Sequence, residues 1–139
     1  MLVATILAAS CGVGNTKSQP TAAQAGANLK AHILKLLDKV SARGPRITDP
    51  GGKDIPCGAG KVKRTFAATA LDNAEQTTPR SLNEMMLGTL SGFADYRLTG
   101  PGGPDFNVVS EGTKTSLHLN SSKHGEYSVS GETACLSRS

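Results

Sequence analysis

Two segments of the chain carry apolar residues at helical spacing. At the start of the first segment, Thr21 and Gln24 have the spacing of a capping box. At its end, Gly44-Pro45 is a pair that stops a helix. The second opens with Thr78 as a good N-cap and with Pro79 at the first helical position. In each segment the apolar residues fall on one face, which predicts two amphipathic helices. These residues are Leu29, Ile33, Leu36, Leu37 and Val40 in the first segment, and Leu82, Met85, Met86, Leu90 and Phe93 in the second.

Elsewhere the pattern has a period of two. Residues Lys61 to Leu71 alternate between apolar and polar, as a half-buried strand does. After Gly92 the pattern is typical of an antiparallel meander, with strands expected at 95–99, 106–111 and 113–120. Gly131, in the last strand, indicates a bulge or a point of close approach. We therefore predict an α+β fold: an antiparallel sheet of about five strands with two helices packed on one face. The last strand is expected to carry four residues on one side: Tyr127, Val129, Thr133 and Cys135.

The N-terminus has the pattern of a lipoprotein signal. Nine uncharged residues precede Ser10, and Leu7-Ala8-Ala9-Ser10-Cys11 is similar to a bacterial lipobox, whose cysteine is acylated. The match departs in two ways, because no Lys or Arg precedes the apolar run and Ala8 stands where Leu is preferred. A start codon placed too late would explain the missing basic residues. The alternative is a buried apolar strand with an ordinary core cysteine.

These observations divide the chain into three parts. Residues 1–10 are expected to be a signal peptide, truncated at its N-terminus, and residues 11–24 a lipidated cysteine followed by a flexible, Gly- and Ser-containing tether. Residues 25–139 are expected to form a single α+β domain. The predicted location is extracytoplasmic, with the lipid anchor holding the protein at the cell membrane.

Two cysteines remain once Cys11 is assigned to lipid. Cys57 and Cys135 are suited to one disulfide in an oxidising compartment, although two separate buried thiols are the alternative. A bridge would require their Cα atoms to lie within about 7 Å. It would therefore bring the first and last strands together in the sheet, most simply as neighbours.

Charge and composition narrow the classes of ligand. The formal net charge is +4, and the densest basic run is Lys61, Lys63 and Arg64. This run is either a solvated strand face or a contact for an anionic lipid or polymer. No aromatic residues lie between its members, which argues against nucleic acid as a partner. The three histidines show no metal-ligand spacing with each other or with a cysteine, so no metal site and no cofactor is predicted.

We find no motif that identifies a catalytic residue. The serine nucleophile motif Gly-x-Ser-x-Gly is absent, and Gly58-Ala59-Gly60-Lys61 lacks the earlier glycine and the hydroxyl residue of a phosphate loop. Two classes of function remain. The first is a non-catalytic binding or structural module for an envelope protein, a polysaccharide or a lipid. The second is a small envelope hydrolase whose active residues are gathered from loops.

The chain resembles small actinobacterial cell-envelope lipoproteins of the mycobacterial LppA type. The resemblance rests on the Cys11 lipobox, on Cys57 ahead of the first predicted strand, and on the closing stretch Gly131-Glu132-Thr133-Ala134-Cys135-Leu136. It covers most of the chain after Cys11 as an order of elements. It implies a lipid anchor, a disulfide and an α+β fold, and it implies no catalytic residues.

Overall fold

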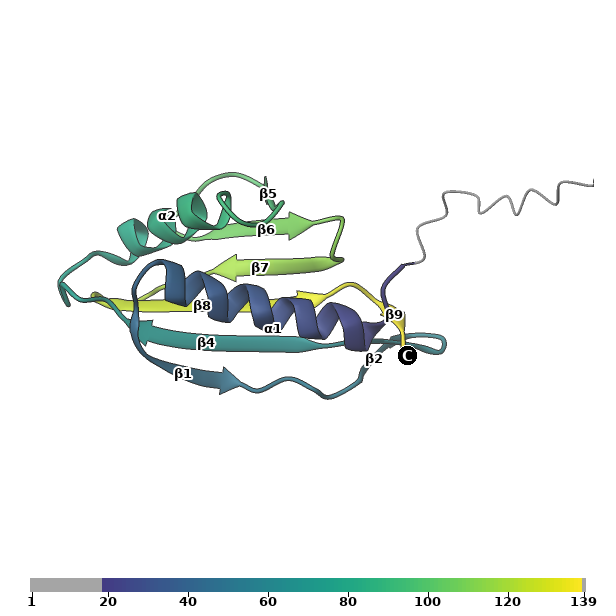
Figure 1. Ribbon diagram of the computed structural model, residues 1–139. Coiled ribbons are helices and arrows are strands. Elements are labelled where there is room, and N and C mark those ends of the chain that lie inside the picture. The colour runs from purple at the N-terminus through teal and green to yellow at the C-terminus, as the bar shows by residue number, and fades with distance from the viewer. Residues whose placement is uncertain (1–18, 139) are drawn as a thin grey trace, which may run out of the picture.

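The computed structural model describes residues 19–138. This part of the chain forms the helices α1 (Ala22–Lys39) and α2 (Pro79–Leu90) and nine strands (Figure 1). The predicted lipidation at Cys11 lies outside the described residues. The strands are β1 (Arg43–Asp49), β2 (Ile55–Gly58), β3 (Lys61–Lys63), β4 (Thr65–Leu71), β5 (Arg97–Thr99), β6 (Phe106–Ser110), β7 (Thr115–Leu119), β8 (Glu126–Thr133) and β9 (Leu136–Ser137).

The strands form two antiparallel sheets. The large sheet has six strands in the order β1-β4-β8-β7-β6-β5, and the small sheet has three in the order β2-β3-β9. The α+β class and the mainly antiparallel pairing are confirmed, but the count of about five strands is wrong. Three of the four additional strands, β1, β2 and β9, are edge strands of seven, four and two residues. The fourth arises because the single strand predicted from Lys61 to Leu71 is divided at Arg64 into β3 and β4, which belong to different sheets. All residues of β2 and all residues of β1 before Asp49 are exposed, so these two strands have no buried face to specify, whereas β9 has only two residues, of which Leu136 is buried.

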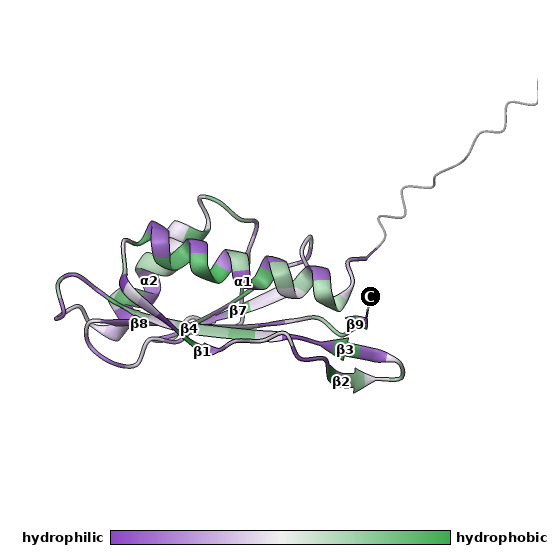
Figure 2. Ribbon diagram, turned by 60° about the horizontal axis from the view of Figure 1, so that its bottom comes forward, coloured by the Kyte–Doolittle hydropathy of each residue, from purple (hydrophilic) through white to green (hydrophobic). Residues whose placement is uncertain are grey.

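Both helices cover the same face of the large sheet (Figure 2). The predicted apolar face of α1 is buried against β4 and β8, and α2 packs against β7 and β8. Gly131 lies at the centre of this interface, since a Cβ atom there would stand 2.5 Å from Leu29 Cδ1 of α1. The predicted close approach is therefore confirmed, and β8 keeps an unbroken register through it.

The capping box at the start of α1 forms as the sequence predicts. The Thr21 side chain accepts a hydrogen bond from the Gln24 backbone N–H at 3.1 Å, and the Gln24 side chain accepts one from the Thr21 N–H at 3.0 Å. Because α1 begins at Ala22, residues 22–24 belong to the folded domain and not to the segment 11–24 that we assigned to the tether.

The small sheet lies at the end of the domain where α1 begins. The first turns of α1 pack Ala22 and Ala25 against Val62 of β3 and Leu136 of β9 in a second apolar cluster. The first turn of α1 and the C-terminal strand consequently lie together in Figure 1. Neither helix of the described chain is long and apolar enough to cross a membrane.

The predicted disulfide ties this end together. Cys57 and Cys135 are bonded, with their Cα atoms 5.9 Å apart. The expected proximity of the first and last predicted strands is also confirmed, because β3 pairs with β9 and β4 pairs with β8. The bridge therefore joins chain segments that already lie next to each other in two sheets.

Candidate functional site

The large sheet has one face that neither helix covers, and we name it the open face. Along β4, β7 and β8 every second residue is buried under the helices, so the residues between them point to the opposite side. Apart from Leu71, which is 44% exposed, those residues are small or polar, and none is Phe, Tyr or Trp. They are Thr65, Ala67, Thr69 and Leu71 in β4, Ser116 and His118 in β7, and Glu126, Ser128, Ser130 and Glu132 in β8.

A concavity of about 520 Å³ lies on this open face. Its lining comes from all six strands of the large sheet and includes two rows of residues across the sheet, which the register of the strands defines. The first row runs Asp49, Ala67, Ser130, His118, Asn107 and Thr99. The second runs Thr65, Glu132, Ser116 and Val109. Six neighbouring strands span roughly 24 Å, so the surface is long enough for an extended ligand lying across the strands.

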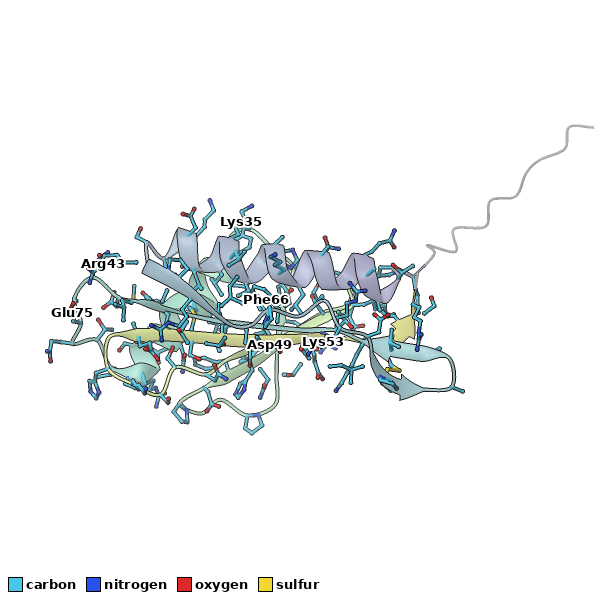
Figure 3. The ribbon with its side chains drawn as sticks, turned by 90° about the horizontal axis from the view of Figure 1, so that it is seen from below. Lys35, Arg43, Asp49, Lys53, Phe66 and Glu75 are labelled. Atoms are coloured by element: carbon cyan, nitrogen blue, oxygen red, sulfur yellow. A yellow bond between two sulfur atoms is a disulfide. The ribbon has the colours of Figure 1, made fainter. Side chains whose placement is uncertain are left out.

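Asp49 stands at the β1 end of the concavity in a fixed orientation. Its Oδ2 accepts a hydrogen bond from the Thr65 hydroxyl at 2.6 Å, and its Oδ1 accepts one from the Gly51 N–H at 2.9 Å. Gly51 has φ +64°, and a Cβ atom there would collide with the Thr65 carbonyl oxygen, so only glycine fits this turn. The Thr65 and Gly51 hydrogen bonds hold the pKa of Asp49 below its ordinary value, with a further contribution from the charge of Lys53 (Figure 3).

His118 stands near the opposite end and binds the loop between β5 and β6. Its Nε2 lies 2.6 Å from Oδ2 of Asp105, the last residue before β6. The same loop is tied to α2, because the Asn83 amide donates a hydrogen bond to the Pro104 carbonyl at 2.9 Å. Two contacts thus fix the C-terminal part of this loop beside the concavity.

The charge of the lining is opposite in sign to that of the whole protein. Among the described residues that line the concavity there are two carboxylates, Asp49 and Glu132, one imidazole, and no Lys or Arg. Glu132 reaches a cation outside the lining, since its Oε2 lies 3.1 Å from Lys63 Nζ. Apolar atoms make up the larger part of the exposed lining, and hydroxyl, amide and carboxylate groups supply the rest. This mixture suits a ligand that is not anionic and that carries both hydrogen-bonding groups and apolar edges.

The basic run predicted as an anion contact lies outside this concavity. Lys63 pairs with Glu132, and Arg64 Nε lies 3.0 Å from Asp54 Oδ1. Lys61 is exposed at the start of β3. The run stays together at the small sheet, but two of its three cations already have carboxylate partners. Their role in binding an anion remains a prediction.

A separate polar chain crosses the helix side of the sheet. His32 Nδ1 lies 2.7 Å from the Tyr96 hydroxyl, which lies 2.6 Å from the Thr115 hydroxyl. Burial lowers the pKa of His32, and the charge of Lys35 lowers it further. This chain links α1 to the β6–β7 hairpin away from the open face. Within residues 19–138, no group of three or more His, Cys, Asp or Glu side chains is placed to hold a metal ion.

Our reading of the sequence missed the open face as a site. The alternation of polar residues in the last strands was visible, but a concavity depends on strand order and curvature, which alternation does not give. No family model, curated protein or solved structure matches this chain, so a functional conclusion has to rest on its own residues.

Proposed function

We propose that this protein is a cell-envelope lipoprotein, anchored through acylated Cys11 to the extracytoplasmic side of the cell membrane, and that it acts as a non-catalytic binding module. The lipobox pattern before Cys11 supports the anchor, as does the resemblance to small actinobacterial lipoproteins. The Cys57–Cys135 disulfide is compatible with an extracytoplasmic location. The concavity on the open face carries the proposal of a binding function.

The chemistry of that concavity favours a neutral, hydroxyl-rich ligand, and we propose a segment of envelope polysaccharide. Ser116, Ser130 and Asn107 offer donors and acceptors, and the carboxylates of Asp49 and Glu132 accept hydrogen bonds from sugar hydroxyls. The same carboxylates repel phosphate-bearing polymers. A lipid tail is less suitable, because the helix–sheet interface is filled by core side chains, and on the open face polar groups alternate with apolar ones, as Ser130 does with Ala67 and Ser116 with Val109.

Anchoring is tested by replacing Cys11. The Cys11→Ala variant should move from the membrane fraction to the soluble fraction, and only the unaltered chain should incorporate labelled fatty acid. A variant that stays in the membrane, together with an unlabelled wild type, would refute the anchor.

Ligand binding is tested by titrating the protein with oligosaccharide fragments of the envelope. Ser116 lies at the centre of the second row, so Ser116→Leu should fill the concavity and weaken binding by at least about tenfold, or about 1.4 kcal/mol. Ser122→Leu, at an exposed position outside the concavity, is the matched control and should bind normally. Equal affinities for the two variants would exclude the open face as the site.

One observation supports the hydrolase as a second candidate. His118 contacts Asp105, and Ser130 lies directly opposite His118 in the β7–β8 register. In serine hydrolases an oriented histidine takes the proton of the serine hydroxyl. Ser130 Oγ accepts a hydrogen bond from the Asn120 amide at 3.3 Å, and within the described residues no hydrogen bond joins it to His118, which favours binding over catalysis. Labelling by a fluorophosphonate probe that disappears in Ser130→Ala would establish the hydrolase.

A further inference from the structure

The positive charge of the protein is gathered at one end of the fold. We name residues 50–64 and 132–138 the tether end, because they form the small sheet and its flanking segments beside the first turn of α1. They contain five Lys or Arg residues and two carboxylates, a net charge of +3. The rest of the described chain contains nine basic and nine acidic residues. The excess of +4 thus belongs to the tether end and to Lys17, which precedes α1 in the sequence.

This asymmetry is kept when neighbouring charged residues are included. Lys30 lines a small crevice together with Arg64, Asp49 is hydrogen-bonded to Thr65, and the Lys114 carbonyl accepts a hydrogen bond from the Ala134 N–H at 2.8 Å. Including Lys30 and Asp49 leaves the net charge at +3, since their charges are opposite, and including Lys114 raises it to +4. Folding therefore converts a sequence with dispersed basic residues into a domain with one cationic end.

Three cations of the tether end are available to a partner. Lys53, Lys61 and Arg138 are exposed, and none of them forms an ion pair within the described chain. Figure 3 shows Lys53 between Asp49 and the small sheet. Ile55 in β2 adds an apolar side chain that is 36% exposed at the same end.

The position of the tether end relative to Cys11 identifies the partner. Cys11 and Thr21 are ten positions apart, and a chain spans at most about 3.5 Å per residue, so α1 begins within about 35 Å of the anchor. The small sheet packs directly on the first turns of α1. Of the two ends of the domain, this one reaches the membrane with the least extension of the connecting segment.

We propose that the tether end docks on the anionic headgroups of the membrane to which the protein is anchored. The inference rests on the proposed lipid anchor for its setting, whereas the attraction itself comes from the charges of the folded domain. Each Lys or Arg held near an anionic lipid surface strengthens binding about fivefold. The concavity of the open face contains no Lys or Arg, so it does not contribute to this attraction, although it adjoins the tether end at Glu132.

The test separates docking from acylation by using the full chain with Cys11→Ser, which has no lipid. It is sedimented with vesicles of phosphatidylcholine alone and with vesicles that also contain phosphatidylglycerol. The apolar residues 1–10 are the same in every variant, so the phosphatidylcholine vesicles measure their contribution. The docking variant is K53Q/K61Q/R138Q, and the matched control, which removes the same charge from exposed positions elsewhere, is K39Q/R46Q/K123Q.

We expect phosphatidylglycerol to strengthen binding at least about tenfold at low ionic strength, and salt to weaken it. The docking variant should lose at least about tenfold, and the control less than about threefold. An equal loss in both variants would show that net charge alone drives binding, and it would overturn the inference. Equal binding of the parent Cys11→Ser chain to both kinds of vesicle would also overturn it, and this result does not depend on whether the docking variant folds. Fatty-acid labelling at Cys11 tests the anchor independently.

Discussion

Gly131→Ala tests the packing of α1 on the centre of the large sheet. The added Cβ would lie 2.5 Å from Leu29 Cδ1, 2.8 Å from Leu117 Cδ2 and 2.7 Å from the Ser116 carbonyl oxygen. The Leu29 methyl group can move if α1 shifts away from the sheet, and the Leu117 methyl group can move if its side chain changes rotamer. The carbonyl oxygen cannot, because β7 is held between β6 and β8. The substitution must therefore distort the β7–β8 pairing or lift the helix.

The cost follows from these contacts. Adding a methyl group to a well-packed interior usually destabilises a protein by about 1–3 kcal/mol. Replacing glycine also reduces the conformational freedom of the unfolded chain, which stabilises the fold by about 0.4–1 kcal/mol where the native conformation tolerates the side chain. Because a backbone atom is one of the obstacles, we expect a net loss of about 2 kcal/mol. For a domain of this size that corresponds to a fall in Tm of roughly 6–10 °C.

The assay is thermal unfolding followed by circular dichroism, with Gly112→Ala as the matched control. Gly112 lies in the turn between β6 and β7, and a Cβ atom there would meet nothing within 4 Å. The control should melt within about 2 °C of the wild type. A Gly131→Ala variant that melts like Gly112→Ala would refute the close packing of α1 at this point.

Three further predictions concern stability. Reduction of the Cys57–Cys135 disulfide, which closes a loop with a sequence separation of 78, should lower the free energy of unfolding by about 4 kcal/mol, and an unchanged denaturation midpoint would contradict this. Gly88→Ala, at an exposed position of α2 with no atom within 4 Å of the new Cβ, should raise stability by about 0.5–1 kcal/mol, and a loss would show that the helix is strained there. The pKa of His32 is lower in the folded protein than its unfolded value of 6.5. Neutral His32 therefore contributes fully to the free energy of unfolding above pH 6.5, and this contribution is lost as the pH falls from 6.5 through the lower pKa of the folded state. His32→Gln should flatten that decline in urea titrations at a series of pH values, and an unaltered slope would assign the decline to other groups.

The helices and central strands could be predicted because local chemistry determines them. The capping box of Thr21 and Gln24 has its own hydrogen bonds, and the apolar stripe of α1 has one surface to bury. In β4 the alternation has the same basis, since one side meets the helices and the other meets water. Each pattern shows which residues face the core and which face water.

The edge strands and the concavity could not be predicted in that way. Every residue of β1 before Asp49 is exposed, so the sequence of this strand shows no alternation of apolar and polar residues. Pro45 also argues against a strand. The site depends on contacts between residues far apart in the chain, such as Asp49 with Thr65 and His118 with Asp105. No local pattern encodes the strand order that brings them together.

The strict alternation in β4, β7 and β8 also separates two kinds of mutational freedom. Neighbouring residues of one strand serve different purposes: Phe66, Leu117 and Val129 hold the helices, while Thr65, Ser116 and Ser130 face the concavity. Surface substitutions away from special contacts usually change stability by no more than about 0.5 kcal/mol. Selection can therefore alter what the open face recognises through one set of positions while the other set keeps the scaffold intact. A lineage of such proteins could diversify its ligands and still retain the same core.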